Sequence, residues 1–228
     1  MNKIKDEMIK YLKQFPKAVD LFNQLLEIGN VYIMGGLLRE YKDKQKIENL
    51  KDADFCIEIE REDLWDNLLH TISYIRNKFL GYKFICDGFK IDVWKIEDTW
   101  AFKEKKIFSE KNEYFSKLQN TVFLSIDGLI YDVKHDIWND TLYEKTMKQK
   151  ELDVVLEENP FIELNILRSF ILQQKYGLTY SEKLKNIILR YLEEHKDYLE
   201  RFIEIQKNRY GYIVMNESDL NNSIVKLK

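Results

Sequence analysis

The stretch from Val31 to Ile59 limits the possible folds more than any other part of the sequence. It begins with four apolar or aromatic residues, Val31-Tyr32-Ile33-Met34, and these stop at Gly35-Gly36. A short apolar run that ends at paired glycines indicates a strand followed by a tight turn, because glycine readily adopts positive φ. The next residues, Leu37 to Tyr41, fit a helical turn whose free amide groups would point outward beside the glycines. Such a place suits a phosphate group, so Gly35 and Gly36 are candidate nucleotide-binding residues.

A second strand follows the polar loop Lys42–Lys51, and it carries two aspartates on one face. The residues from Asp52 to Ile59 alternate strictly, so Asp52 and Asp54 would project from the face opposite Phe55. Aspartate is disfavoured in strands, and two carboxylates spaced this way repel each other by about 2–3 kcal/mol at an effective dielectric of about 20. A divalent cation would remove that repulsion, and carboxylate oxygens are suitable ligands for Mg²⁺. The alternative is a solvated face at the start of a strand.

A third aspartate belongs to a predicted hairpin. Lys83–Cys86 and Phe89–Trp94 fit two strands joined by an Asp-Gly turn, with Asp92 in the middle of the second strand. An aspartate within an apolar strand requires a partner. Two acids on one strand and a third on a neighbour are the set that two-metal phosphoryl transfer uses. We therefore expect Asp52, Asp54 and Asp92 to be metal-binding and catalytic residues for two Mg²⁺ ions, with Mn²⁺ as an alternative ion.

These residues resemble the motifs of a known family. Met34-Gly35-Gly36-Leu37-Leu38-Arg39-Glu40 is similar to the Gly-Gly-x-x-Arg-Asp signature of class II CCA-adding tRNA nucleotidyltransferases and bacterial poly(A) polymerases, in the DNA polymerase beta superfamily. Lys51-Asp52-Ala53-Asp54-Phe55 resembles the family's Asp-x-Asp metal motif, and Ile91-Asp92-Val93 resembles the strand with its third acid. Two later segments, Gly128–Asp132 and Ile166–Phe170, resemble further motifs, so that the resemblance extends from about Val31 to Leu189.

The resemblance implies an α+β fold, namely a polymerase-beta-like nucleotidyltransferase domain with a mixed sheet over residues 1–150, followed by a small all-helical domain over residues 151–228. The implied reaction is metal-dependent transfer of a nucleoside monophosphate from an NTP to a hydroxyl, with tRNA or another RNA 3′ end among the acceptors, and release of pyrophosphate. The nucleotide-binding residues would be Gly35, Gly36, Arg39 and Arg168. Two alternatives remain open: transfer to a small molecule or a protein, and a nucleotide-binding regulatory module without turnover.

The sequence departs from the family where the incoming base is read. The first arginine of the family's Glu-Asp-x-x-Arg motif is replaced by Asn165, and the preceding Glu-Asp pair is missing. In the family this motif reads the Watson–Crick edges of CTP and ATP. We therefore expect no ordered C-C-A addition. The asparagine of a further family motif is replaced by Asp127.

The remaining pattern predicts mostly helices. Residues 3–28 fit two helices divided at Pro16, and residues 61–80 fit one helix that ends at Gly81. Thr121–Ile126 and Leu129–Trp138 fit a second hairpin, with Asp127-Gly128 as its turn. A helix that stops at Gly177 precedes a long helix from Ser181 to about Gln206. Residues 211–228 carry no clear signal.

Composition and charge restrict the partners. Hydrophobic residues make up 45% and charged residues 33% of the 228, which is typical of a globular domain. No apolar run approaches the roughly 20 residues of a membrane span, and the N-terminus is not a signal peptide, so we expect a cytoplasmic protein without a membrane partner. The net charge of −3 argues against a large phosphate-binding surface, and the lysine-rich segment 103–117 is the best local candidate. Cys56 and Cys86 are expected to be reduced and structural.

Overall fold

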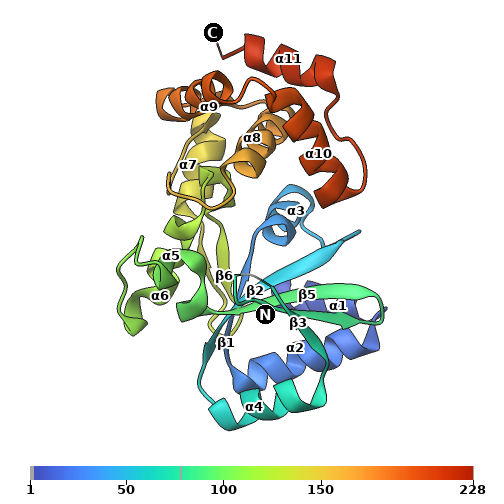
Figure 1. Ribbon diagram of the computed structural model, residues 1–228. Helices are drawn as coiled ribbons and strands as arrows, with labels where there is room; N and C mark the ends of the chain where they lie inside the picture. Colours follow the sequence, from blue (N-terminus) through green and yellow to red (C-terminus); the bar gives the residue numbers. More distant parts are fainter. Residues whose placement is uncertain (1–2, 78, 228) are drawn as a thin grey trace. The chain divides into compact units, whose positions relative to one another are not determined.

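The computed structural model describes residues 3–77 and 79–227. The chain forms two compact units, one made of Met1–Thr121 and Asp127–Thr141, the other of Val122–Ile126 and Leu142–Lys228. The first unit contains a mixed sheet with helices, and the second is mainly helical (Figure 1). The α+β fold class predicted from the sequence is therefore confirmed.

A mixed sheet of seven strands forms the centre of the first unit, counted over the described residues. The strands are β1 Gly29–Met34, β2 Asp52–Ile59, β3 Tyr74–Arg76, β4 Tyr82–Cys86, β5 Phe89–Lys95, β6 Ile130–Asp132 and β7 Ile137–Asn139. Their order across the sheet is β3-β4-β5-β2-β1-β6-β7. The central pair, β2 and β5, is parallel, whereas every other neighbouring pair is antiparallel. The two strands with the predicted acids are thus neighbours in the middle of the sheet.

Helices α1, α2 and α4 belong to one face of the sheet (Figure 1). Their bounds are α1 Lys3–Leu12, α2 Pro16–Ile28 and α4 Glu62–Thr71. The ring of Phe22 lies 5.4 Å from that of Phe55, and Trp65 packs edge-on against Tyr82 at 4.9 Å. The division of the N-terminal helices at Pro16 is confirmed. Because Phe55 belongs to the apolar set of β2, the alternation predicted for this strand places its aspartates on the opposite face.

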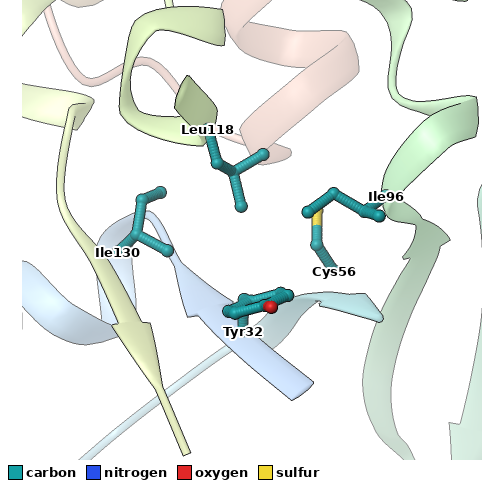
Figure 2. Close-up of a cluster of buried hydrophobic side chains, with 5 residues drawn as sticks. All are labelled: Tyr32, Cys56, Ile96, Leu118 and Ile130. Carbon is teal, nitrogen blue, oxygen red and sulfur yellow. The ribbon is translucent and has the colours of Figure 1, made fainter. Parts of the chain in front are cut away.

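The opposite face is covered partly by a compact apolar cluster. Tyr32, Cys56, Ile96, Leu118 and Ile130 are all buried and form this cluster (Figure 2). Between β5 and β6 the chain forms two short helices, α5 Trp100–Lys103 and α6 Tyr114–Leu118, and 3₁₀ turns at Ile96–Asp98, Lys111–Glu113, Gln119–Thr121 and Ser125–Asp127. Burial, together with the charge of Asp54, raises the pKa of the Cys56 thiol, so this cysteine stays neutral and serves packing. The apolar cover therefore lies directly beside the acid-bearing part of β2.

The helix predicted over residues 61–80 is wrong beyond Thr71. The chain leaves α4 there and forms the edge strand β3, in which Tyr74 lies opposite Phe84. The Asn77 side chain accepts hydrogen bonds of 2.9 Å from the backbone of Phe79 and of Gly81, which favours a turn over a helix. Gly81 does not cap a helix but accommodates a crossing ring, because a Cβ on it would lie 2.4 Å from Trp94 Nε1.

The first predicted hairpin is confirmed and the second is wrong. Asp87 and Gly88 both have positive φ between β4 and β5, as an Asp-Gly turn requires. Residues 127–128 do not form a hairpin turn; the observed hairpin joins β6 to β7. Its turn follows Asp132, whose carboxylate accepts hydrogen bonds from the backbone of Lys134 and His135. Residues 122–126 pair instead with residues 153–156, for example through Val155 N–H to the carbonyl of Phe123 at 2.9 Å.

The second unit is built mainly from helices. Its elements are α7 Thr141–Gln149, β8 Glu151–Leu152, α8 Ile162–Tyr176, β9 Thr179–Tyr180, α9 Glu182–Glu194, α10 Tyr198–Tyr210 and α11 Glu217–Val225. The predicted end of a helix at Gly177 is confirmed, and so is the cap of α9 by Ser181, which accepts from Leu184 N–H. The single helix predicted from Ser181 to about Gln206 is wrong, because the chain reverses between α9 and α10 so that Phe202 can stack on Tyr191. Residues 211–227, which carry no sequence signal, contain α11.

None of the helices within residues 3–77 and 79–227 is both long enough and apolar enough to cross a membrane.

Candidate metal and nucleotide site

Three predicted acids lie on one face at the centre of the sheet. Asp54 on β2 is the register partner of Asp92 on β5, so the two side chains leave the sheet on the same side. Asp52 lies two residues earlier on the same face. Adjacent strands are about 4.8 Å apart, so the backbones of Asp54 and Asp92 are neighbours across the sheet. Asp52 is exposed, Asp54 is half-buried and Asp92 is only 7% exposed, so burial of the acids increases in that order.

The glycine turn adjoins these acids. Met34, the last residue of β1, is the register partner of Asp54, and Gly35 follows it with a φ of 74°. A Cβ on Gly35 would lie 3.6 Å from Asp54 Oδ2, so the absence of a side chain leaves space beside this carboxylate. Helix α3 (Gly36–Lys44) starts at the turn and is held by buried Leu37 and Leu38. Because the first amides of a helix have no intrahelical acceptor, N–H donors face outward next to Asp54.

Arg39 on α3 is already engaged by an acid. Its guanidinium forms an ion pair with the Asp127 carboxylate, and the two side chains are only 12% and 9% exposed. A Cβ on Gly36 would lie 3.7 Å from the Arg39 guanidinium, so the arginine also adjoins the turn. Arg39 is predicted from the sequence, whereas its partner Asp127 is not. The replacement of a neutral asparagine by Asp127 is the signal that could have revealed the pair.

Two lysines border the acids on the side away from β1. Lys83 on β4 is the register partner of Asp92, and its Nζ lies 3.5 Å from Asp92 Oδ2. Lys90 on β5 is exposed and lies opposite Asp52. Neither lysine was identified from the sequence, although the alternation of β4 predicts that Lys83 faces away from the apolar side chain of Phe84. Positive charge therefore adjoins the acid set on the β4 side.

The acids suit a hard divalent cation by donor type and by placement. All three are carboxylates, the oxygen ligands that Mg²⁺ prefers, and Asp54 and Asp92 occupy neighbouring register positions on the same face of the sheet. Within residues 3–77 and 79–227, however, no three aspartate, glutamate, histidine or cysteine side chains are grouped closely enough to hold a metal ion. A metal site at Asp52, Asp54 and Asp92 thus requires these side chains to turn toward a common centre.

The second unit carries the remaining predicted site residue and the positions that match the family's base-reading motif. Arg168 is half-buried on α8, whereas the three acids, Gly35, Gly36 and Arg39 belong to the first unit. Asn165 is buried, and its amide donates to Asn159 Oδ1 at 2.7 Å. Glu163 accepts from Tyr191 and from Arg201 at 2.8 Å each. The positions that match the family's base-reading motif are therefore occupied with internal contacts of the helical unit.

Comparisons of the sequence with protein-family models and with curated proteins give no match. The fold, by contrast, is similar to those of solved CCA-adding enzymes. A CCA-adding enzyme in complex with ATP matches with a TM-score of 0.56 at 18% identity, over 86% of this chain and 49% of that chain. The Thermotoga maritima CCA-adding enzyme complexed with tRNA matches with a TM-score of 0.54 at 18% identity, over 93% of this chain and 47% of that chain.

A tRNA-processing enzyme in an apo form gives a TM-score of 0.57 at 16% identity, over 91% of this chain and 55% of that chain. This chain thus spans about half the length of these enzymes. The resemblance to CCA-adding enzymes that the sequence predicts is confirmed for the fold.

Proposed function

We propose that this chain is a metal-dependent nucleotidyltransferase, which moves a nucleoside monophosphate from an NTP to a hydroxyl acceptor. The observation that carries the proposal is the register of the central strands, which sets Asp54 opposite Asp92 with the Gly35 turn beside them. The fold similarity supports the proposed function, because CCA-adding enzymes of similar fold have been solved in complex with ATP and with CTP. The acceptor hydroxyl loses its proton to the Asp92 carboxylate or to water, and its oxygen bonds to the α-phosphorus of the NTP. The bond from that phosphorus to the bridging oxygen breaks, and pyrophosphate leaves.

The side chains have distinct roles in this proposal. Asp52 and Asp54 would hold two Mg²⁺ ions, or Mn²⁺, together with the triphosphate, and Asp92 would complete the site beside the attacking hydroxyl. The outward amides at Gly35 and Gly36 donate hydrogen bonds to phosphate oxygens. Arg39, which is paired with Asp127, orients the phosphates or balances part of their negative charge. When bound, the metal supplies charge neutralisation of the phosphates and a more acidic acceptor hydroxyl. Arg168 remains a candidate nucleotide contact from the second unit.

The base choice is proposed to differ from that of CCA-adding enzymes. Reading a base by its edge requires donors and acceptors that the wrong base leaves unpaired. Asn165 replaces the arginine and already donates to Asn159, and Glu163 is bound by Arg201. We therefore propose transfer without ordered C-C-A addition. An RNA 3′ end, including that of tRNA, is the first acceptor to test, because one solved structure of this fold is a complex with tRNA. A small molecule and a protein are the two other acceptors to test.

A nucleotide-binding module without turnover is the second candidate. The ion pair between Lys83 and Asp92 favours this second function, because the lysine ammonium occupies a position beside Asp92 that a catalytic metal ion would need. The presence of all three acids favours the enzyme, since a module that only binds nucleotide has no need of Asp92.

The test is to incubate the protein with each labelled NTP, Mg²⁺ and total cellular RNA, and to locate the label. Asp52→Asn and Asp54→Asn should each abolish labelling, whereas melting temperatures should hold or rise slightly because one repelling charge is removed. Asp92→Asn should retain nucleotide binding and lose transfer. The matched control is Asp66→Asn, an exposed aspartate on α4, which should label as the wild type does. Near wild-type transfer by the Asp54 variant would rule out the metal-site assignment, and nucleotide binding without any labelling would favour the module.

A further inference from the structure

Asp92 lies between two charges of opposite sign. Strand β5 runs between β4 and β2, so the register partners of Asp92 are Lys83 on one side and Asp54 on the other. All three side chains leave the same face of the sheet. Asp92 is thus attracted toward β4 and repelled from β2, which is the strand that carries the other acids.

The contact to Lys83 is direct. Lys83 Nζ lies 3.5 Å from Asp92 Oδ2, with the lysine side chain 34% exposed and the aspartate side chain 11% exposed. A nearly buried carboxylate is costly unless it is paired, so the ammonium offsets part of the cost of burying Asp92. The lysine itself reaches solvent and can turn away without being buried elsewhere. Asp92 therefore needs a positive partner, whereas Lys83 can exchange this contact for water.

We infer that Lys83 sets the metal affinity of the site by competing with the divalent cation for the Asp92 carboxylate. This inference rests on the proposed function, because it takes Asp92 as a metal ligand. In the metal-free chain the ammonium supplies the positive charge next to Asp92, and binding of the cation requires Lys83 to turn toward solvent.

The chain offers a matched control in Lys90. It lies on the same face of β5, carries the same charge and is the register partner of Asp52, the exposed acid. Replacing Lys90 removes one positive charge from the vicinity of the acids without removing the partner of Asp92. A comparison of the two lysines separates competition for one carboxylate from the general field of a positive charge.

The experiment is a titration of the nucleotide-free protein with Mn²⁺, in which free Mn²⁺ is followed by electron paramagnetic resonance. Lys83→Met should bind Mn²⁺ about three- to tenfold more tightly than the wild type, as expected for loss of a partly buried competing pair. Lys83→Arg should stay within about twofold of the wild type, and so should Lys90→Met. If the methionine variant does not fold, Lys83→Gln provides the same test, because it removes the charge and keeps a donor beside Asp92.

The outcomes separate this inference from the proposed function. Equal tightening in Lys83→Met and Lys90→Met, or no tightening in Lys83→Met, would overturn the role of Lys83 and leave the metal site intact. Mn²⁺ binding that Asp54→Asn does not reduce would place the metal elsewhere and contradict the proposed function. Absence of binding in the wild type and in Lys83→Met alike would overturn both. Binding in Lys83→Met alone would support the inference in its strongest form.

Discussion

Gly35 and Gly36 are adjacent, yet the backbone gives them different tasks. Gly35 has a φ of 74°, and a Cβ there would touch the Asp54 carboxylate, whereas Gly36 begins α3 and has no positive φ. A residue with a Cβ at positive φ costs about 1–2 kcal/mol, whereas alanine in a helix is preferred to glycine. We therefore predict that Gly35→Ala lowers the free energy of unfolding by about 1–2 kcal/mol. Gly36→Ala should leave it unchanged or raise it by up to about 1 kcal/mol.

Both alanine variants should weaken nucleotide binding, because each places a methyl group where phosphate oxygens approach the amides. Urea unfolding gives the stabilities, and titration with Mg²⁺ and ATP gives the affinities. A Gly36→Ala protein that binds nucleotide as the wild type does would restrict the turn to a structural role.

The pair between Arg39 and Asp127 connects α3 to the residue at which the chain returns to the first unit. Arg39 belongs to α3, and Asp127 belongs to the short 3₁₀ turn before β6. Because both side chains are nearly buried, removing one partner leaves a charge without compensation. Asp127→Asn, which introduces the residue of the resembled family, should cost about 2–4 kcal/mol of unfolding free energy. The double variant Arg39→Met, Asp127→Asn should recover part of that loss, as a double-mutant cycle in urea would show.

The exposed pair Arg61–Asp63 is the control for this cycle, with side chains that are 56% and 67% exposed. Asp63→Asn should change the unfolding free energy by less than about 1 kcal/mol. A similarly small cost for Asp127→Asn would mean that Arg39 finds another partner and that the pair does not fix α3.

The elements that the sequence predicts well are those with a local signal. The Asp-Gly turn at Asp87 and the cap at Ser181 each depend on residues that are neighbours in the chain, and both are observed. The end of α4 depends on contacts that the local pattern does not contain. Ile72 and Ile75 continue a helical spacing, but the Asn77 side chain closes a turn, and a Cβ at position 81 would require the Trp94 and Asn77 side chains to shift.

The same distinction applies to the candidate site. Alternation along β2 was enough to place Asp52 and Asp54 on one face, and that placement is observed. The ion partners of Asp92 and Arg39 were not predicted, because they come from β4 and from the turn before β6. Which strand lies beside which is decided by the whole sheet, and no motif in the sequence records it.

The two units cannot be separated by one cut of the chain. The chain leaves the first unit after Thr121 and returns to it at Asp127, and the intervening segment Val122–Ile126 belongs to the second unit. Phe123, Leu124 and Ile126 are buried, and the segment forms backbone hydrogen bonds with residues 153–156. We predict that a fragment of residues 1–141 keeps strand circular dichroism but binds a hydrophobic dye, because these side chains lose their cover.

Leu124→Ser should have opposite consequences in the two contexts. In the fragment it should reduce dye binding, whereas in the whole chain it should lower the unfolding free energy by about 2–4 kcal/mol, because a buried apolar side chain is lost. Dye fluorescence and urea unfolding measure the two effects. A fragment that binds no dye would show that Val122–Ile126 finds apolar cover within residues 1–141.

The position of Val122–Ile126 in the chain, between two segments of the first unit, also affects folding during synthesis. A ribosome adds about 5–20 residues per second, so this apolar segment emerges before the residues at 153–156 that pair with it. Once Asn139 has been added, the sheet of the first unit has all its strands available, while Phe123 and Leu124 remain without their partners until residues 153–156 follow. A newly made chain therefore passes through a state in which a folded sheet carries an uncovered apolar loop, a form that chaperones bind and that aggregates in their absence.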